Sequence, residues 1–261
     1  MFTYFNYNLV MSNIIPYAQA YLNTKLETWY VHTIFDDIPS TNTYLKEQAH
    51  FLSDRTIILA NQQSSGRGRY QRQFKSIRDK GIYCSFLMKN FDAHALTQLS
   101  FACALALAIT IHELYQLRPQ IKWPNDLLLN AKKVAGILIE TMHKAETMDV
   151  VIGIGLNVYH QDFGDLNATS LEDDYSSPID RNHFIIHFFK VFDTVIKTED
   201  ILMLYRKWMV PSGEVITTSI KGIKEQVTIL DIQKNGALLV KKEDGTEFSL
   251  FNEEIQILSN L

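Results

Sequence analysis

The sequence predicts an α+β fold in which a mixed sheet with its helices is followed by a small β domain. Apolar runs with strand character alternate with helical patterns through residues 31–210, whereas residues 211–261 hold only short strand runs and turns. The length of 261 residues and the hydrophobic share of 46% are enough for a substantial core. We therefore expect one large domain, one small domain and an N-terminal extension over residues 1–30.

The helices and strands of the large domain follow from local patterns. Ser40 or Thr41 can cap a helix over 41–52, because hydroxyl oxygens accept hydrogen bonds from free backbone N–H groups. Residues 94–115 repeat apolar side chains at steps of three or four, which predicts a largely buried helix. Helices are also expected at 182–196 and about 199–209, and strands at 31–35, 56–60, 82–88, 126–130, 133–141 and 150–157.

The segment Pro211-Ser212-Gly213 marks the domain boundary. Beyond it, turn signals at Lys234-Asn235-Gly236 and Asp244-Gly245 separate short β runs. The expected strands are 215–218, 226–232, 237–240, 247–251 and 254–258. So many short hairpin strands in so few residues suggest a small barrel.

Composition narrows the function classes. A net charge of −4 and a pI near 6.1 argue against wholesale nucleic-acid binding, which normally shows as a basic domain. Cys84 and Cys103 sit in apolar runs without metal-ligand spacing, so no metal site is predicted. The N-terminus lacks a signal-peptide pattern, and no run approaches the roughly 18 to 20 apolar residues of a membrane helix. These features predict a cytoplasmic protein without membrane contact, for which Met11 is an alternative start.

Residues 121–140 place a polar elbow between two apolar runs. Pro124 has no N–H to give to a sheet, and Asn125-Asp126 are turn formers whose side chains can hold a ligand or a cation. A turn at 130–132 then brings Lys133 into the second strand, close to the elbow. Taken alone, Lys133 is more often an exposed hairpin lysine than a ligand, but its place beside the elbow makes it a candidate.

A glycine-rich basic loop covers residues 66–80. It holds six cations and one acid, which is a local charge of +5 in a chain of net charge −4. Gly66 and Gly68 let the main chain approach a ligand closely, and the neighbouring arginines offer bidentate donors to phosphate or carboxylate. Such a loop taken alone is most often a solvated surface loop, and a nucleic-acid patch is a further alternative.

The strand expected at 150–157 contains Gly153 and Gly155. Glycines at alternate positions weaken a strand, so the pair suggests one face kept bare for something to lie against it. A β-bulge is the alternative interpretation.

Four segments in this order resemble the biotin protein ligases, enzymes that activate biotin with ATP and attach it to a carrier lysine. They are Ser40-Thr41-Asn42, Gly66-Arg67-Gly68-Arg69, Lys122 to Asp126 with Lys133 to Ile137, and Gly153 to Asn157, and they span most of residues 31–210. Each segment is weak alone, and the four together are specific. The resemblance implies a mixed-sheet, class II synthetase-like catalytic domain of the biotin/lipoate ligase type, followed by an SH3-like β-barrel.

The same resemblance implies the reaction and its partners. Biotin would be activated with ATP and Mg²⁺ to biotinyl-5′-AMP and then transferred to a lysine of a biotin carboxyl carrier domain, from acetyl-CoA carboxylase or another biotin-dependent carboxylase. About 30 residues precede the first catalytic strand, which is too few for the winged helix of the repressor-type members. We therefore expect a monofunctional ligase that binds no nucleic acid, with a homodimer through sheet edges left as an option.

The resemblance also assigns roles to residues. Catalysis falls to Lys133, Arg69 and Asp126. The biotin contacts are Ser40, Thr41, Asn42, Gln63, Arg67, Gly68, Arg69, Lys133, Gly153 and Gly155. The ATP contacts are Arg69, Arg72, Phe74, Asn125, Asp126, Lys133 and Asn157.

The chain departs from the family pattern in the basic loop. Gln71 stands where the family has a third glycine, and Phe74 stands where it has tryptophan. Phe74 can still stack on an adenine face, whereas Gln71 makes the loop less permissive. Two alternatives therefore stay open, namely a lipoate or octanoate ligase or transferase of related fold, and a catalytically inactive biotin-binding sensor.

Overall fold

The structure is a computed structural model that describes residues 14–144, 146–220, 223–251 and 255–257. Its centre is a seven-stranded mixed sheet in which β1 and β2 are parallel and every other neighbouring pair is antiparallel. In spatial order the strands are β1 (Tyr30–Phe35), β2 (Thr56–Ala60), β3 (Gly81–Phe91), β7 (Met148–Asn157), β6 (Lys132–His143), β5 (Asp126–Leu129) and β4 (Gln120–Lys122).

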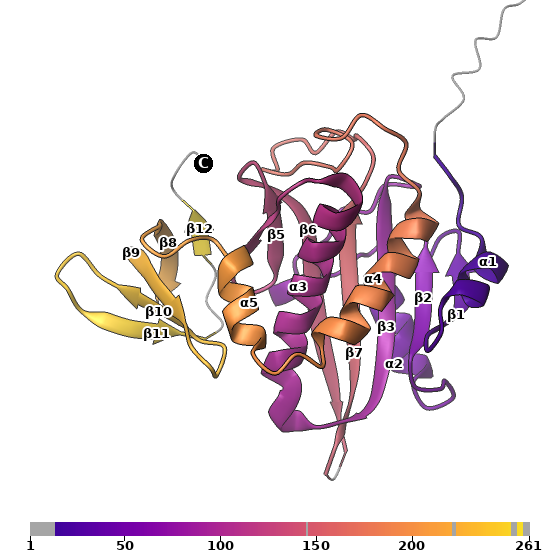
Figure 1. Cartoon of the computed structure of the whole chain (residues 1–261), viewed down its shortest axis with the longest axis horizontal. Helices are drawn as coiled ribbons and strands as arrows, with labels where there is room; N and C mark the ends of the chain where they lie inside the picture. Colours follow the sequence, from indigo (N-terminus) through magenta and orange to yellow (C-terminus); the bar gives the residue numbers. More distant parts are fainter. Residues whose placement is uncertain (1–13, 145, 221–222, 252–254, 258–261) are drawn as a thin grey trace, which may run out of the picture.

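Helices cover both faces of this sheet unequally (Figure 1). One face carries α3 (Leu96–Tyr115), with α4 (Arg181–Val195) and α5 (Ile201–Trp208) packed against α3. The other face carries α2 (Thr41–Gln48), which contacts β2, β3 and β7. The short helix α1 (Gln19–Lys25) packs beside β1 and α4, and two single-turn 3-10 helices are η1 (Arg69–Gln71) and η2 (Ala93–Ala95).

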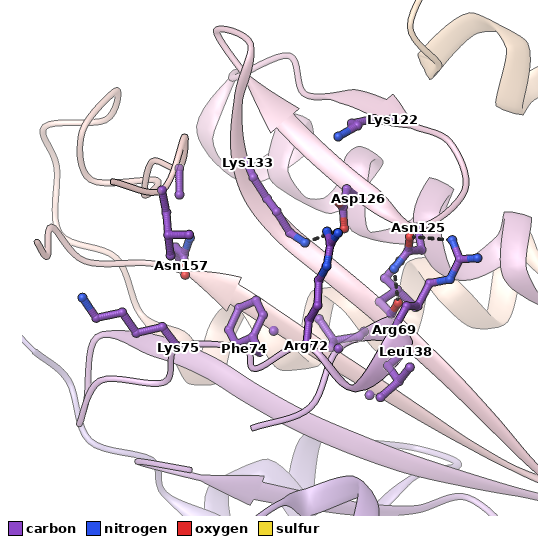
Figure 2. Close-up of a pocket in the computed structure, with 18 of the residues that line it drawn as sticks. Arg69, Arg72, Phe74, Lys75, Lys122, Asn125, Asp126, Lys133, Leu138 and Asn157 are labelled. Carbon is purple, nitrogen blue, oxygen red and sulfur yellow. Dashed lines mark hydrogen bonds and ion pairs between the residues drawn. The ribbon is translucent and has the colours of Figure 1, made fainter. Parts of the chain in front are cut away.

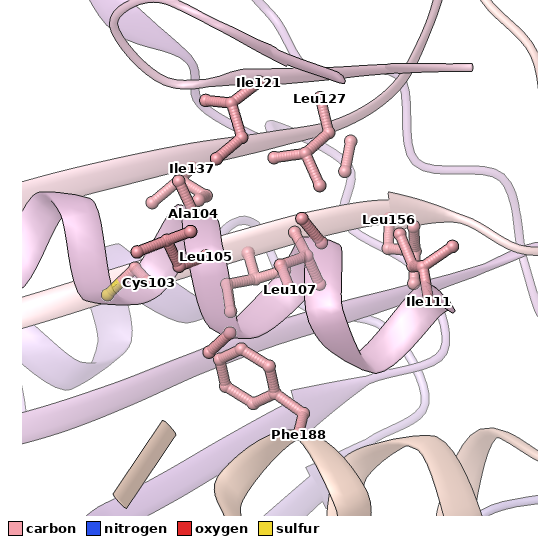
Figure 3. Packing of buried hydrophobic residues seen from close by; sticks show 14 of the residues in the cluster. Cys103, Ala104, Leu105, Leu107, Ile111, Ile121, Leu127, Ile137, Leu156 and Phe188 are labelled. Atoms are coloured by element: carbon pink, nitrogen blue, oxygen red, sulfur yellow. The ribbon is translucent and has the colours of Figure 1, made fainter. Parts of the chain in front are cut away.

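The main core lies between the sheet and α3. Figure 3 shows α3 side chains such as Leu107 and Ile111 between the sheet and Phe188 of α4. Because side chains alternate along a strand, Ile57 faces this core while Ile58 faces a smaller cluster under α2. The sheet is therefore covered by α3 on one face, whereas α2 covers only part of the other face, next to β2, β3 and β7.

The C-terminal residues form a separate five-stranded antiparallel sheet, with the order β11-β10-β9-β8-β12. The strands are β8 (Val215–Ile220), β9 (Ile223–Ile232), β10 (Leu238–Lys241), β11 (Glu247–Leu250) and β12 (Ile255–Ile257). Arg206 on α5 holds this sheet through a bidentate pair to Asp231, with both N···O distances at 2.7 Å. The β9–β10 turn also reaches the polar elbow, where the Trp123 indole N–H donates to the Gly236 carbonyl at 2.9 Å.

The sequence identified most of these elements and missed three features. The helix expected over 41–52 ends at Gln48, because the chain turns there, with the Phe51 N–H donating to the Gln48 carbonyl at 2.9 Å. Helix α1 and the three-residue strand β4 were not expected. The strand expected at 254–258 lies partly outside the described residues, and 255–257 of it form β12.

Candidate active site

A single cavity of about 650 Å³ opens beside β6 and β7, and all the residues assigned above line it. It is walled by the start of α2, the basic loop, the polar elbow and the β5–β6 hairpin. Figure 2 shows side chains of the loop, the elbow and the hairpin around it. The volume is in the range of sites that bind small molecules and cofactors. The assigned residues on its walls are Ser40, Thr41, Asn42, Gln63, Arg67, Gly68, Arg69, Arg72, Phe74, Asn125, Asp126, Lys133, Gly153, Gly155 and Asn157.

The polar elbow is fixed on β6 by reciprocal hydrogen bonds. The Asn125 amide donates to the Ile137 carbonyl at 2.8 Å, and the Ile137 N–H donates to the Asn125 carbonyl at 2.9 Å. The Trp123–Pro124 peptide bond is cis, and the Trp123 side chain is buried. This arrangement places Asp126 at the first position of β5, on the cavity wall.

Lys133 reaches Asp126 across the hairpin. Asn130 and Ala131 take positive φ values of 47° and 60°, which form the tight two-residue turn between β5 and β6. The Lys133 Nζ lies 2.6 Å from Asp126 Oδ1, and the lysine side chain remains 37% exposed. The pair sits over Gly136, where an added Cβ would lie 3.1 Å from Lys133 Nζ. Gly136 thus leaves room for the pair, which is a role that the sequence did not suggest.

The basic loop supplies further cations to the same end of the cavity. The Arg69 guanidinium donates to Asn125 Oδ1 at 3.4 Å, and its Cζ lies over the Tyr70 ring at 5.0 Å from the ring centroid. Figure 2 shows Arg72 extending from the loop toward Lys133 and Asp126. Arg78 instead pairs with Asp36 outside the cavity at 2.6 Å. The positive charge of the loop is therefore divided, and only part of it faces the cavity.

Gly153 and Gly155 keep the floor of the cavity bare. Neither position shows a register shift in its pairing with β3 or β6, so the bulge interpretation is wrong. A Cβ on Gly153 would overlap the Asn42 side chain, and a Cβ on Gly155 would overlap the Phe74 ring. The bare face predicted from the glycine pair is present, and Asn42 and Phe74 of the same chain lie against it.

The end of the cavity under α2 carries mainly uncharged hydrogen-bonding groups, with Arg67 as the charged side chain beside them. Gln63 Oε1 accepts from the Thr41 backbone N–H at 2.9 Å and lies 3.1 Å from the Thr41 hydroxyl. The Thr41 hydroxyl also lies 2.6 Å from the hydroxyl of Ser85, which is fully buried on β3 and donates to Asn42 Oδ1. Groups of this kind can orient a neutral polar ring.

Glu140 on β6 lies behind this network. Its carboxylate accepts from Asn42 at 3.0 Å and from Lys46 at 2.8 Å, and Arg67 lies 3.6 Å away. Burial raises the pKa of Glu140, but the hydrogen bonds from Lys46 and Asn42 and the charges of Lys46 and Arg67 outweigh burial and hold the pKa below its usual value. The group is therefore a carboxylate at neutral pH.

A family model described as the biotin/lipoate A/B protein ligase family matches residues 34–157, which contain all four motif segments. Residues 34–157 thus form a biotin/lipoate A/B protein ligase domain.

Relatives of this ligase domain agree with that assignment. A bifunctional ligase/repressor BirA of Bacillus subtilis is 34% identical over 181 residues, which are 65% of this chain and 55% of the relative. A biotin–[acetyl-CoA-carboxylase] ligase of Paracoccus denitrificans is 40% identical over 124 residues, which are 46% of this chain and 51% of the relative. The chain thus spans about half the length of both proteins.

A solved structure extends the likeness to the whole fold. The biotin protein ligase from Aquifex aeolicus in complex with biotin and ATP matches with a TM-score of 0.74 and 25% identity, over 87% of this chain and 98% of that chain. This likeness confirms the predicted α+β class with its mixed sheet and small C-terminal β unit.

The ligase domain ties Asn157 into place through residues that the sequence did not single out. Its amide donates to the Thr169 carbonyl at 3.0 Å and accepts from Gln161 at 3.2 Å. The segment that contains Thr169 also pairs with the backbone of Lys133. The Lys133 N–H donates to the Asn167 carbonyl at 3.0 Å. Asn157 therefore lines the cavity with its orientation already fixed.

Sequence reasoning also missed Ser85, Lys46 and Glu140. Ser85 was the lone serine in the apolar run 82–88, and Glu140 was the first acid after the apolar run of β6. Both positions could have indicated a buried hydrogen-bond network, because a polar group inside a buried strand needs a partner. Nothing local linked the two, since their connection runs through Asn42 on a different element.

The two cysteines of the ligase domain are core residues, although Cys84 also borders the cavity. Burial raises the pKa of the Cys84 and Cys103 thiols, as expected for core cysteines. Among the described residues, no cluster of three or more His, Cys, Asp or Glu side chains could hold a metal ion.

One helix among the residues that the structure describes, 93–115, is long and apolar enough to cross a membrane. However, 61% of its most apolar stretch is buried inside the protein, as in a core helix.

Proposed function

We propose that this chain is a biotin–protein ligase that forms biotinyl-5′-AMP from biotin and ATP and then biotinylates a lysine of a carrier domain. The observation that carries the proposal is one cavity with two unlike ends. One end holds Lys133, Arg69 and Arg72 around Asp126, and the other holds the uncharged hydrogen-bonding groups of Thr41 and Gln63. A ligand with an anionic tail and a neutral polar ring matches both ends.

The first step joins two anions. An oxygen of the biotin carboxylate attacks the α-phosphorus of ATP, the bond to the bridging oxygen breaks, and pyrophosphate leaves with the electron pair. Two unit negative charges at about 4 Å repel by roughly 1 kcal/mol in water and by several times more in a less polar site. Cations fixed in advance offset this repulsion, and Lys133 and Arg69 are placed to supply them.

The nucleotide needs a metal ion as well as the cationic side chains. Mg²⁺ arrives with the polyphosphate and is usually held by phosphate oxygens, waters and one or two carboxylates. Asp126 is the carboxylate on the cavity wall at the phosphate end, so it fits such an ion. Phe74 beside the bare floor of Gly155 offers an aromatic face to the adenine.

The second step releases AMP. A neutral carrier lysine attacks the acyl carbon of biotinyl-5′-AMP, an amide bond forms, and the acyl–oxygen bond to the phosphate breaks. The lysine loses a proton in this step. The carrier is a biotin carboxyl carrier domain of acetyl-CoA carboxylase or another biotin-dependent carboxylase, in line with the activity named for the Paracoccus relative.

Pyrophosphate release tests the proposal directly. The purified chain, ATP and Mg²⁺ are mixed with biotin, lipoate or octanoate, and pyrophosphate is measured. We expect release with biotin at a rate well above the rates with the other two acids. Preferred release with lipoate or octanoate would replace the proposal with the related ligase activity. Binding of biotin without any release would make the chain a sensor.

Transfer of labelled biotin to a purified carrier domain then tests the second half-reaction. A carrier in which arginine replaces the acceptor lysine is the matched control, because it keeps the charge and removes the nucleophile. Label on the lysine carrier alone is the expected result. A cytoplasmic location, the lack of nucleic-acid binding and a homodimer remain predictions, and a chromatographic mass measurement tests the last of these.

A further inference from the structure

The hydrogen-bond network behind the uncharged end of the cavity begins at Glu140. This side chain is 14% exposed. The Asn42 amide nitrogen donates to Glu140 Oε2 at 3.0 Å and to the Leu138 carbonyl at 3.4 Å. A carboxylate and a carbonyl can only accept hydrogen bonds, so both require the NH₂ side of the amide. The Asn42 amide oxygen is therefore turned toward Ser85.

The protons of the next two hydroxyls follow from that orientation. Ser85 has one hydroxyl proton and donates it to Asn42 Oδ1. The contact of 2.6 Å between the Ser85 and Thr41 hydroxyls must then use the proton of Thr41. Thr41 has no second proton for Gln63 Oε1, which lies 3.1 Å from its hydroxyl oxygen.

The orientation of the Gln63 amide is fixed independently. Its Oε1 accepts from the Thr41 backbone N–H at 2.9 Å, and its nitrogen donates to the Ser76 hydroxyl at 3.2 Å. Thr41 Oγ1 and Gln63 Oε1 therefore face each other as two acceptors on the cavity wall. Such a pair lacks a donor, and an N–H group of a ligand would satisfy both oxygens.

We infer that Glu140 sets the hydrogen-bond polarity of the ring-binding end, through Asn42, Ser85 and Thr41, so that this end accepts a ligand N–H. Glu140 is a positioning residue, because it acts through Asn42 and does not line the cavity. The ligand class is a cyclic urea or a similar ring with an N–H edge. The identity of that ring as biotin rests on the proposed function, whereas the polarity itself does not.

The charges around Glu140 support this arrangement. Lys46 at 2.8 Å and Arg67 at 3.6 Å keep the group ionised, so it stays an acceptor. A glutamine there could turn either its oxygen or its nitrogen toward Asn42, and the direction of every following hydrogen bond would become ambiguous. Lipoate and octanoate carry no N–H group, so the same polarity discriminates against them.

The test combines Glu140→Gln with Ser85→Ala. Each variant interrupts the series of hydrogen bonds from Glu140 to Thr41 at a different point. We expect each to raise the Kd for biotin by about tenfold, as measured by titration calorimetry without ATP. The KM for biotin should rise in parallel, while kcat and the KM for ATP stay within about twofold. Glu225→Gln is the matched control, since it removes a carboxylate paired with Lys242 at 2.6 Å in the C-terminal sheet.

The double variant separates a directional chain from a structural loss. If Glu140 acts through Ser85, the double variant should bind biotin about as weakly as either single variant. Multiplied effects in the double variant, or a Glu140→Gln Kd within about twofold of the wild type, would overturn the inference. If Glu140→Gln does not fold, Ser85→Ala carries the test alone, and an unchanged Kd for biotin in it would be decisive against the chain.

The calorimetric measurement also keeps the two proposals apart. A wild-type protein that binds biotin but releases no pyrophosphate defeats the proposed function and leaves the polarity test intact. A wild-type protein that releases pyrophosphate while both variants bind biotin normally defeats only the polarity inference.

Discussion

The two ends of the cavity are built in opposite ways. The charged end carries Lys133 and Arg69 on a hairpin and a loop, and the Lys133 side chain is 37% exposed. The uncharged end carries Thr41, Asn42 and Ser85 on a helix start and a central strand, where all three are buried. Exposed charges on turns can rearrange around phosphates, whereas a buried network holds a neutral ring in one orientation.

The largest expected effect comes from breaking the charged end. Lys133→Ala removes a cation that offsets the repulsion between the two reacting anions, so we expect pyrophosphate release to fall by about a thousandfold or more. Binding of biotin at the uncharged end should weaken far less. Single-turnover formation of biotinyl-5′-AMP is the measurement.

Lys234→Ala is the control for that experiment. Lys234 is an exposed lysine in the β9–β10 turn, so the control also removes a hairpin lysine. A Lys133→Ala protein with near-normal turnover would show that the charged end does not depend on this residue. A thermal melt close to that of the wild type would show that the fold is intact.

The second effect separates the two ends along one strand. Gly153→Ala would push into Asn42, and Gly155→Ala would push into Phe74. We expect the first variant to raise the Kd for biotin by about tenfold and the second to raise mainly the KM for ATP. If both variants changed the same constant, the division of the cavity into two ends would be wrong.

Much of the fold was readable from the sequence because its signals were local. The strands of the hairpin, the buried helix α3 and the turn at Asn130 each follow from a few adjacent residues. Strand β4 was missed because three residues are too short for a period-two pattern. Helix α1 was missed because a single buried residue, Leu22, gives no apolar stripe.

The candidate site could likewise be predicted only in part from the sequence. Motif residues were found, and the structure brings them to one cavity, although their roles in binding remain predictions. Arg78 looked like part of the same positive loop, but it turns outward to Asp36. The Glu140 network was not readable, because hydrogen bonds between α2, β3 and β6 depend on the folded sheet and leave no spacing pattern in the chain.

A third prediction concerns how the charged end is supported by the C-terminal sheet. Trp123→Phe keeps most of the buried ring but loses the hydrogen bond of 2.9 Å to the Gly236 carbonyl. We expect a loss of about 1 kcal/mol in the free energy of unfolding and a melting temperature lower by about 2–4 °C. Trp208→Phe is the control, since the Trp208 indole N–H has no hydrogen-bond partner in the part of the chain that the structure describes.

That support should reach the charged end and not the uncharged one. Because Trp123 belongs to the elbow that holds Asp126, Trp123→Phe should raise the KM for ATP by about twofold to threefold while the Kd for biotin stays the same. A changed Kd for biotin with an unchanged KM for ATP would reverse the proposed connection.

The smallest expected effect is the pH dependence of the stability that Glu140 contributes behind the uncharged end. Burial raises the pKa of Glu140, but its partners, led by the hydrogen bond from Lys46, lower the pKa overall from the usual value of 4.5. A carboxyl whose folded-state pKa is depressed contributes stability above its unfolded-state pKa and loses that contribution as pH falls through the folded-state pKa. The wild type should therefore exceed Glu140→Gln in stability at neutral pH by about 1 kcal/mol or less, and the difference should vanish below the folded-state pKa. Denaturant unfolding of both proteins at several pH values measures this, and a difference that persisted at the acid end would place its origin in packing and not in charge.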